Sequence, residues 1–210
     1  MNEDKKNTGL ILCLTGPMAA GKNAAADILE KKGFISVDAD QLGHKALESV
    51  SDKVIERFSQ EAEKEGIQLT DSQGRIIRRN LGALLFKDKK LLQEHEKIIF
   101  PQINDLIENF AKENQGKNII INATVLYKTD FIKKCRAILY IDCPLIKRLF
   151  RARKRDNMPF KQILQRFHSQ KNLFAKYKKS NADIRRVRNT GTISDLEKKI
   201  DRFLTEFNMN

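Results

Sequence analysis

The sequence has 210 residues, of which 40% are hydrophobic and 32% are charged. This length predicts one main domain, and no apolar run approaches the ~20 residues of a membrane helix, which excludes a helical membrane protein. Because the first residues are polar and do not resemble a secretory signal, we expect a cytoplasmic protein without a membrane partner.

The net charge of +13 indicates an anionic partner, but the basic residues lack the interleaved aromatic residues that favour nucleic acid. Nothing in the sequence predicts the oligomeric state.

The first predicted element is a strand over residues 10–15, an apolar run of the kind that is buried on both faces. Gly16, Gly21 and Lys22 follow it at the spacing GxxxxGK, and an alanine-rich helix is predicted over 23–31. In such a loop, backbone N–H groups surround phosphate oxygens and the lysine reaches the β and γ phosphates. The expected ATP contacts of this segment are Gly16, Pro17, Met18, Ala19, Ala20, Gly21, Lys22, Asn23 and Ala24.

Three side chains near this loop are candidates for metal binding and proton transfer. Ser or Thr normally follows the lysine and binds Mg²⁺, whereas this chain has Asn23, a weaker ligand. A second strand predicted over 34–38 leads into Asp38 and Asp40, at the edge of an open parallel sheet where ligands bind. Either carboxylate suits Mg²⁺ or the proton of an attacking hydroxyl. A helix cap and a surface turn are the alternative interpretation of these aspartates.

The rest of the chain alternates helices and strands, and its apolar strands are typical of a parallel sheet. The further expected elements are helices over 41–49 and 53–65, a loop or small hairpin over 67–76, helices over 78–86 and 89–112 with a break or kink near Pro101, strands over 117–122 and 137–142, helices over 144–155 and 160–171, a strand over 183–187, and a helix over 194–207 that begins with a capping box of Ser194 and Glu197. The three cysteines lack CxxC spacing and are predicted to be buried free thiols.

Basic side chains crowd the helix predicted over 144–155. Arg148, Arg151 and Arg155 are spaced by three and four residues, which places them along one helix face. Phosphoryl transfer needs the charge of the γ-phosphate neutralised and a hydroxyl aligned behind it. The arginines therefore indicate the lid of a P-loop kinase, although a solvated basic helix is the more common meaning of such a pattern.

These residues resemble one family closely, the dephospho-CoA kinases, over nearly the whole chain. Val37-Asp-Ala-Asp40 is similar to its Ile-Asp-Ala-Asp signature. The other matching motifs are Leu-Thr-Gly16, the segment from Thr70 to Arg78, Phe86-Lys-Asp88, Arg151 to Asp156 with Gln170 beyond it, and Asn189-Thr-Gly191.

The resemblance implies an α/β P-loop kinase fold in which a five-stranded parallel sheet is flanked by helices. It implies a single kinase domain over 1–210, comprising a core (about 9–50, 117–145 and 181–210), a helical CoA-binding region (about 51–116) and an arginine-rich lid (about 146–180). The reaction would be phosphorylation of the ribose 3′-hydroxyl of dephospho-CoA by ATP with Mg²⁺, the last step of coenzyme A synthesis. The implied roles are Asp40 as base with Lys22 and Arg155 as further catalytic residues, Arg151, Arg155 and Asn189 at ATP, Asp38, Asp40, Arg78 and Leu126 at the substrate, and Asn23 and Asp38 at the metal.

Several positions depart from the family pattern, and three of them replace carboxylates. The departures are Pro17, Ala19, Ala20, Asn23, Phe100, Asn122, Thr124, Lys128 and Arg188. They leave two alternatives open: a diverged P-loop protein that binds nucleotide without this catalysis, or a kinase for another nucleoside or small metabolite.

Overall fold

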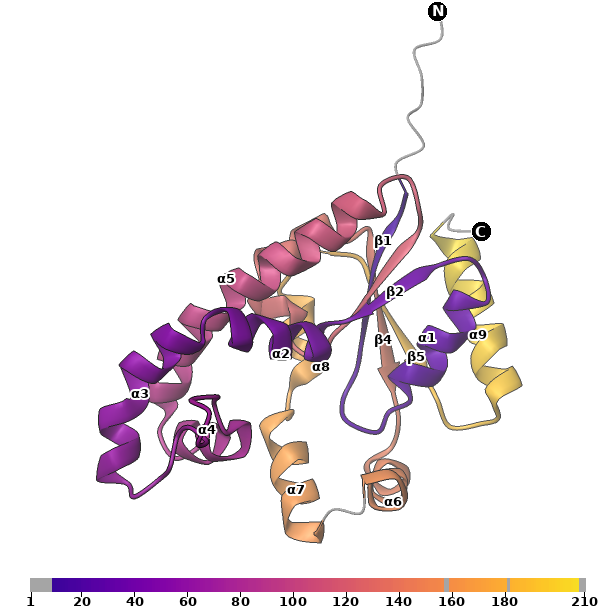
Figure 1. The fold of residues 1–210 in the computed structure, drawn as a ribbon. Coiled ribbons are helices and arrows are strands. Elements are labelled where there is room, and N and C mark those ends of the chain that lie inside the picture. The colour runs from indigo at the N-terminus through magenta and orange to yellow at the C-terminus, as the bar shows by residue number, and fades with distance from the viewer. Residues whose placement is uncertain (1–8, 157–158, 181, 208–210) are drawn as a thin grey trace, which may run out of the picture. The chain divides into compact units, whose positions relative to one another are not determined.

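The computed structural model describes residues 9–156, 159–180 and 182–207, and it confirms the predicted α/β fold. Its centre is a five-stranded parallel sheet in the order β2-β3-β1-β4-β5 (Figure 1). The strands are β1 (Ile11–Thr15), β2 (Ile35–Asp38), β3 (Ile119–Asn122), β4 (Ala137–Asp142) and β5 (Ile184–Arg188). All four pairings between neighbouring strands are parallel, so the carboxyl ends of β1, β2 and β3 share one edge.

Helices follow the strands, as the periodicity predicted. Their bounds are α1 (Lys22–Glu30), α2 (Ala39–Ser49), α3 (Ser51–Lys64), α4 (Arg78–Leu85), α5 (Lys89–Glu113), α6 (Leu145–Asp156), α7 (Phe160–Ser169), α8 (Leu173–Lys178) and α9 (Ile193–Glu206), with the short 3₁₀ helices η1 (Leu126–Lys128) and η2 (Asp130–Lys134) between β3 and β4. The predicted joint between the two basic helices includes residues 157–158, which lie outside the described residues.

Helices α1 and α9 lie side by side against one face of the sheet (Figure 1). The largest apolar cluster fills the space between them and β1, β3 and β4, and includes Leu12, Leu14, Leu139 and Phe203. Burying side chains of this size contributes about 1.5–3 kcal/mol each. This core fixes β1 and α1, and therefore holds both ends of the loop that connects them.

Helix α8 supplies aromatic packing through Phe174 and Tyr177. The ring of Phe174 meets that of Tyr140 edge-on at 4.9 Å, and Tyr177 is completely buried.

The three cysteines are free and buried, as predicted. Burial raises the pKa of Cys135 to about 12 and that of Cys13 well above its usual value, so neither thiol is reactive near neutral pH.

By its internal contacts the chain divides into two compact units, one formed by the residues up to 40 and from 107 onward, the other by Gln41–Leu106. The second unit has its own apolar core, which includes Phe58, Leu81, Leu84 and Ile99. A single antiparallel bridge between Thr70 and Ile76 closes the segment predicted as a loop or small hairpin. The assignment of 51–116 to CoA binding and of 146–180 to a lid stays a prediction.

Two local predictions were wrong, and one alternative of a third is excluded. Of the break or kink predicted near Pro101, the break does not occur, because α5 continues through this residue: Ile99 and Ile103 pack into the same core on either side, and this outweighs one lost backbone hydrogen bond. Helix α8 was missed because six residues carry too little periodicity to be distinguished from a loop. The capping box lies two residues earlier than predicted, where Thr192 accepts from the Asp195 N–H and Asp195 accepts from the Thr192 N–H.

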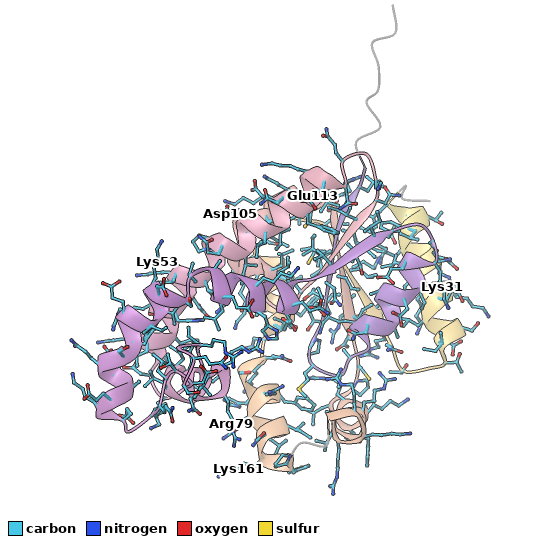
Figure 2. All side chains as sticks on the ribbon, in the orientation of Figure 1. Lys31, Lys53, Arg79, Asp105, Glu113 and Lys161 are labelled. Atoms are coloured by element: carbon cyan, nitrogen blue, oxygen red, sulfur yellow. The ribbon has the colours of Figure 1, made fainter. Side chains whose placement is uncertain are left out.

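Arg148 is buried, and the other charged residues whose burial the structure describes are exposed or half-buried. Figure 2 labels Lys31 after α1 and Lys161 in α7, both exposed and pointing away from the strands. Within the part of the chain that the structure describes, every helix is too short or too polar to cross a lipid bilayer.

Candidate active site

The loop between β1 and α1 has the shape that the GxxxxGK spacing predicted. Gly16 and Gly21 both have positive φ, at 150° and 103°. A Cβ at Gly16 would collide with the carbonyl oxygen of Ile141, and one at Gly21 with the side chain of Asn189. Glycine is therefore required at both positions for conformation and for space.

Helix α1 begins at Lys22 without a side-chain cap, so its first N–H groups are available to an anion. The Lys22 Nζ donates to the carbonyl oxygen of Gly16 at 3.1 Å, which holds the ammonium group over the loop. Burial lowers the pKa of Lys22, while the neighbouring carboxylates of Asp40 and Asp38 oppose the shift and Arg155 adds to it. Positive and negative side chains therefore surround the start of the helix.

A pocket of about 230 Å³ brings together most of the side chains that the sequence singled out. Its lining residues are Met18, Ala19, Lys22, Asn23, Asp38, Asp40, Asn122, Thr124, Arg155, Arg166 and Gln170. A second cleft of about 480 Å³ opens beside the same loop, between Gly21, Arg151 and Lys154. Lys22 and Arg155 line both cavities, so each of these cations can contact a ligand in either one.

Asp38 and Asp40 enter the pocket from the end of β2 and the start of α2. Asp38 is the last residue of the strand, and its Oδ1 accepts a hydrogen bond from the Asp40 N–H at 2.8 Å. Asp40 lies in the first helical turn, and its side chain is exposed. The sequence placed both residues at the carboxyl edge of the sheet, and the structure confirms that position.

Side chains from α6 and from the residue after β5 donate hydrogen bonds to the backbone of the loop. The Asn189 Nδ2 donates to the carbonyl oxygen of Ala20 at 2.9 Å, and the Arg151 Nη1 donates to the same oxygen at 3.4 Å. Arg148 also contacts the loop, and Arg166 and Gln170 line the pocket. The sequence indicated Arg148 by its spacing from Arg151 and Gln170 by the family motif, whereas nothing in it indicated Arg166.

Two expected site residues, Leu126 and Arg78, line neither of the two cavities beside the loop. The Leu126 side chain is buried, and its N–H donates to the Tyr177 hydroxyl at 3.0 Å. Arg78 is exposed at the first position of α4, in the unit Gln41–Leu106. Lys128 lines a separate cleft of about 1100 Å³ that also contains Tyr127 and Lys176. Of the departures at 122, 124 and 128, only the first two therefore line the pocket.

Ala19 has a strained backbone, with φ at 60°. A residue with a Cβ loses about 1 kcal/mol or more in this left-handed region, and glycine does not. We expect Ala19→Gly to raise the free energy of unfolding by about 1 kcal/mol, measured by urea denaturation. Ala24→Gly, in the regular helix α1, is the matched control and should lower it by a similar amount. If both changes lowered the free energy of unfolding equally, the backbone of Ala19 would not be strained.

Comparisons with known proteins agree with this arrangement. The sequence profile of dephospho-CoA kinase matches residues 10–195. A dephospho-CoA kinase of Treponema denticola is 40% identical over 201 residues, covering 94% of this chain and 90% of that protein. One of Treponema pallidum is 36% identical over 198 residues, covering 93% and 94%. The solved structure of a dephospho-CoA kinase from Campylobacter jejuni, 24% identical, covers 93% of this chain and 96% of its own with a TM-score of 0.64, which supports the fold. The chain belongs to the dephospho-CoA kinase family.

Proposed function

We propose that this protein transfers the γ-phosphate of ATP to the ribose 3′-hydroxyl of dephospho-CoA, giving CoA and ADP. The observation that carries the proposal is that Lys22, Asp38, Asp40 and Arg155 line one pocket together, in a chain of this family. Asn23, Asn122 and Thr124 depart from the family pattern, but they leave these four charged groups together. A protein that only binds nucleotide would not need a proton acceptor beside the lysine, which is the task assigned to Asp40.

The proposed mechanism assigns a task to each charged group. Asp40 accepts the proton of the 3′-hydroxyl, whose oxygen attacks the γ-phosphorus while the bond to the ADP oxygen breaks. Lys22 and the first N–H groups of α1 hold the β and γ phosphates. Arg155 neutralises charge that develops on the transferred group, and Arg151 and Asn189 support the loop at the ATP side. Substrate contacts by Asp38, Arg78 and Leu126 are further parts of this proposal.

The donor set of the pocket fits Mg²⁺. This ion is usually held by one or two carboxylates together with substrate phosphates and water. Asp38 and the amide oxygen of Asn23 would hold it, and the ion would offset phosphate charge. Among the described residues, no group of three or more His, Cys, Asp or Glu is arranged to bind a metal by itself.

A panel of ligands tests the substrate class. Thermal unfolding is measured with dephospho-CoA, CoA, nucleoside monophosphates and shikimate, each alone. A ligand at 100 times its Kd stabilises the folded state by about 2.7 kcal/mol, so specific binding is readily detected. We expect dephospho-CoA to raise the Tm most. A larger shift with a nucleoside monophosphate or shikimate would assign a different substrate.

The metal position gives a prediction for Asn23. A serine hydroxyl is the usual Mg²⁺ ligand after the loop lysine, and an amide is a weaker one. We therefore expect Asn23→Ser to lower the Mg²⁺ concentration that gives half the maximal rate, measured at saturating ATP. An unchanged Mg²⁺ requirement would mean that Asp38, phosphates and water hold the ion without residue 23.

The lowered pKa of Lys22 predicts a pH dependence of ATP affinity. Only the charged ammonium attracts phosphate, so affinity should be complete below this pKa and should fall as the pH rises through it toward the usual 10.5. Calorimetric titration with ATP across the alkaline range measures this. The matched variant Lys22→Arg stays charged and should keep a constant affinity there. A decline in the arginine variant as steep as in the native protein would contradict the assignment to Lys22.

A further inference from the structure

The backbone of Met18, in the middle of the phosphate-binding loop, is held on both sides by residues of the two basic helices. The Met18 N–H donates to the Oε1 of Gln170 at 2.7 Å, and its carbonyl oxygen accepts from the Nε of Arg148 at 2.8 Å. Gln170 caps the end of α7, and Arg148 lies in α6. Both polar groups of one loop residue are therefore satisfied by side chains that are at least 130 residues away in the sequence.

The side chain of Met18 joins the same two helices. It is 8% exposed and packs in a small apolar cluster with Ala152 of α6 and with Ile163 and Phe167 of α7. This cluster is separate from the large core beneath the sheet. The loop residue is thus part of the packing of α6 and α7, so a movement of either helix displaces the loop backbone.

Arg148 is an unusual residue to find in this position. It is 9% exposed, its guanidinium lies 4.2 Å from the ring centroid of Phe167, and within the described residues no carboxylate forms an ion pair with it. Its Nη2 is buried without a hydrogen-bond partner. Burial lowers its pKa, because loss of solvent disfavours the charged form. Burying such a cation costs stability. The hydrogen bond to the Met18 carbonyl oxygen and the cation–π contact with Phe167 offset part of this cost.

The attachment of Met18 lies directly before Ala19, whose backbone is strained. Ala19 has positive φ, and a strained conformation persists only where its surroundings determine it. Two hydrogen bonds and a buried side chain fix Met18 immediately before it. The strained segment leads directly into Gly21 and Lys22, at the start of α1.

We propose that Arg148 and Gln170 are positioning residues which, through Met18, hold the phosphate-binding loop in the shape that binds ATP. They act through the loop backbone, and the coupling makes the loop shape depend on the placement of α6 and α7. This inference rests on the proposed function only in taking ATP as the ligand of the loop.

Two variants of Arg148 separate the hydrogen bond from the charge. Arg148→Gln places an N–H donor at the same distance along the side chain as the Nε and removes the charge, whereas Arg148→Met removes both. A hydrogen bond of this kind changes an equilibrium by about fivefold to tenfold. We expect Arg148→Met to weaken ATP binding by that factor and Arg148→Gln to restore it, as measured by calorimetry. Native affinity in the methionine variant, or equal loss in both, would overturn the proposal.

A measurement without nucleotide tests the same attachment independently of any reaction. Amide hydrogen exchange of the Met18 N–H is followed by NMR in the native protein and in Gln170→Met, which keeps the volume but loses the acceptor. We expect exchange to be about fivefold to tenfold faster in the variant, while the amides of β3 remain unchanged. Unaltered exchange at Met18 would overturn the attachment. A protein that showed both effects but formed no CoA would contradict the proposed function alone.

Discussion

Asp40→Asn is expected to lower the rate of phosphate transfer by about 10²–10⁴-fold, the range that a positioned general base contributes. Asparagine has nearly the same shape, but its amide cannot accept the proton of the attacking hydroxyl. ATP affinity should change little, because the loop and Lys22 remain intact. Single-turnover kinetics and calorimetric ATP binding measure the two effects separately.

The matched control is Asp27→Asn, which makes the same replacement of a carboxylate by an amide at an exposed position of α1. Its rate should equal that of the native protein. If Asp40→Asn kept the native rate, Asp40 would not be the base. If it lost ATP binding as well, its main contribution would be to the charge balance around Lys22.

Arg155→Ala is expected to lower kcat by about 10³–10⁵-fold, as for arginines that stabilise a transferring phosphoryl group. Arg155 lines both cavities beside the loop, and its charge acts on Lys22. Because the charge it neutralises develops in the transition state, the loss should fall on kcat more than on the KM for ATP. Steady-state kinetics with varied ATP checks this.

The same helix provides the control. Arg153 is exposed, and it lines neither of the cavities that contain Arg155. Arg153→Ala removes an equal charge from α6 and should change kcat only slightly. Similar losses in the two variants would indicate a general effect of the basic charge on nucleotide attraction, in place of a specific contact by Arg155.

Much of the site was predictable because it consists of local motifs at the ends of strands. Gly16, Gly21 and Lys22 follow β1 directly, and Asp38 ends β2. In a parallel sheet these ends meet at one edge, so sequence order alone brings the motifs together. The alternation of apolar and helical segments likewise predicted all five strands to within two residues.

The contacts that support the site were not predictable, since they join distant segments through single side chains. Tyr177 holds the segment after β3 by hydrogen bonds to Ala123 and Leu126, more than 50 residues away, from a helix too short to be recognised. The basic spacing in α6 indicated a face of exposed arginines, and nothing in it revealed that Arg148 is buried against Met18. Burial of a charged side chain depends on tertiary packing, which local periodicity does not contain.

The central claim is tested most directly by incubating the purified protein with ATP, Mg²⁺ and dephospho-CoA and identifying the product. The account predicts equal amounts of ADP and CoA, with the new phosphate on the ribose 3′-oxygen as located by ³¹P NMR. ATP binding without phosphate transfer to dephospho-CoA, or transfer to a different hydroxyl, would contradict it.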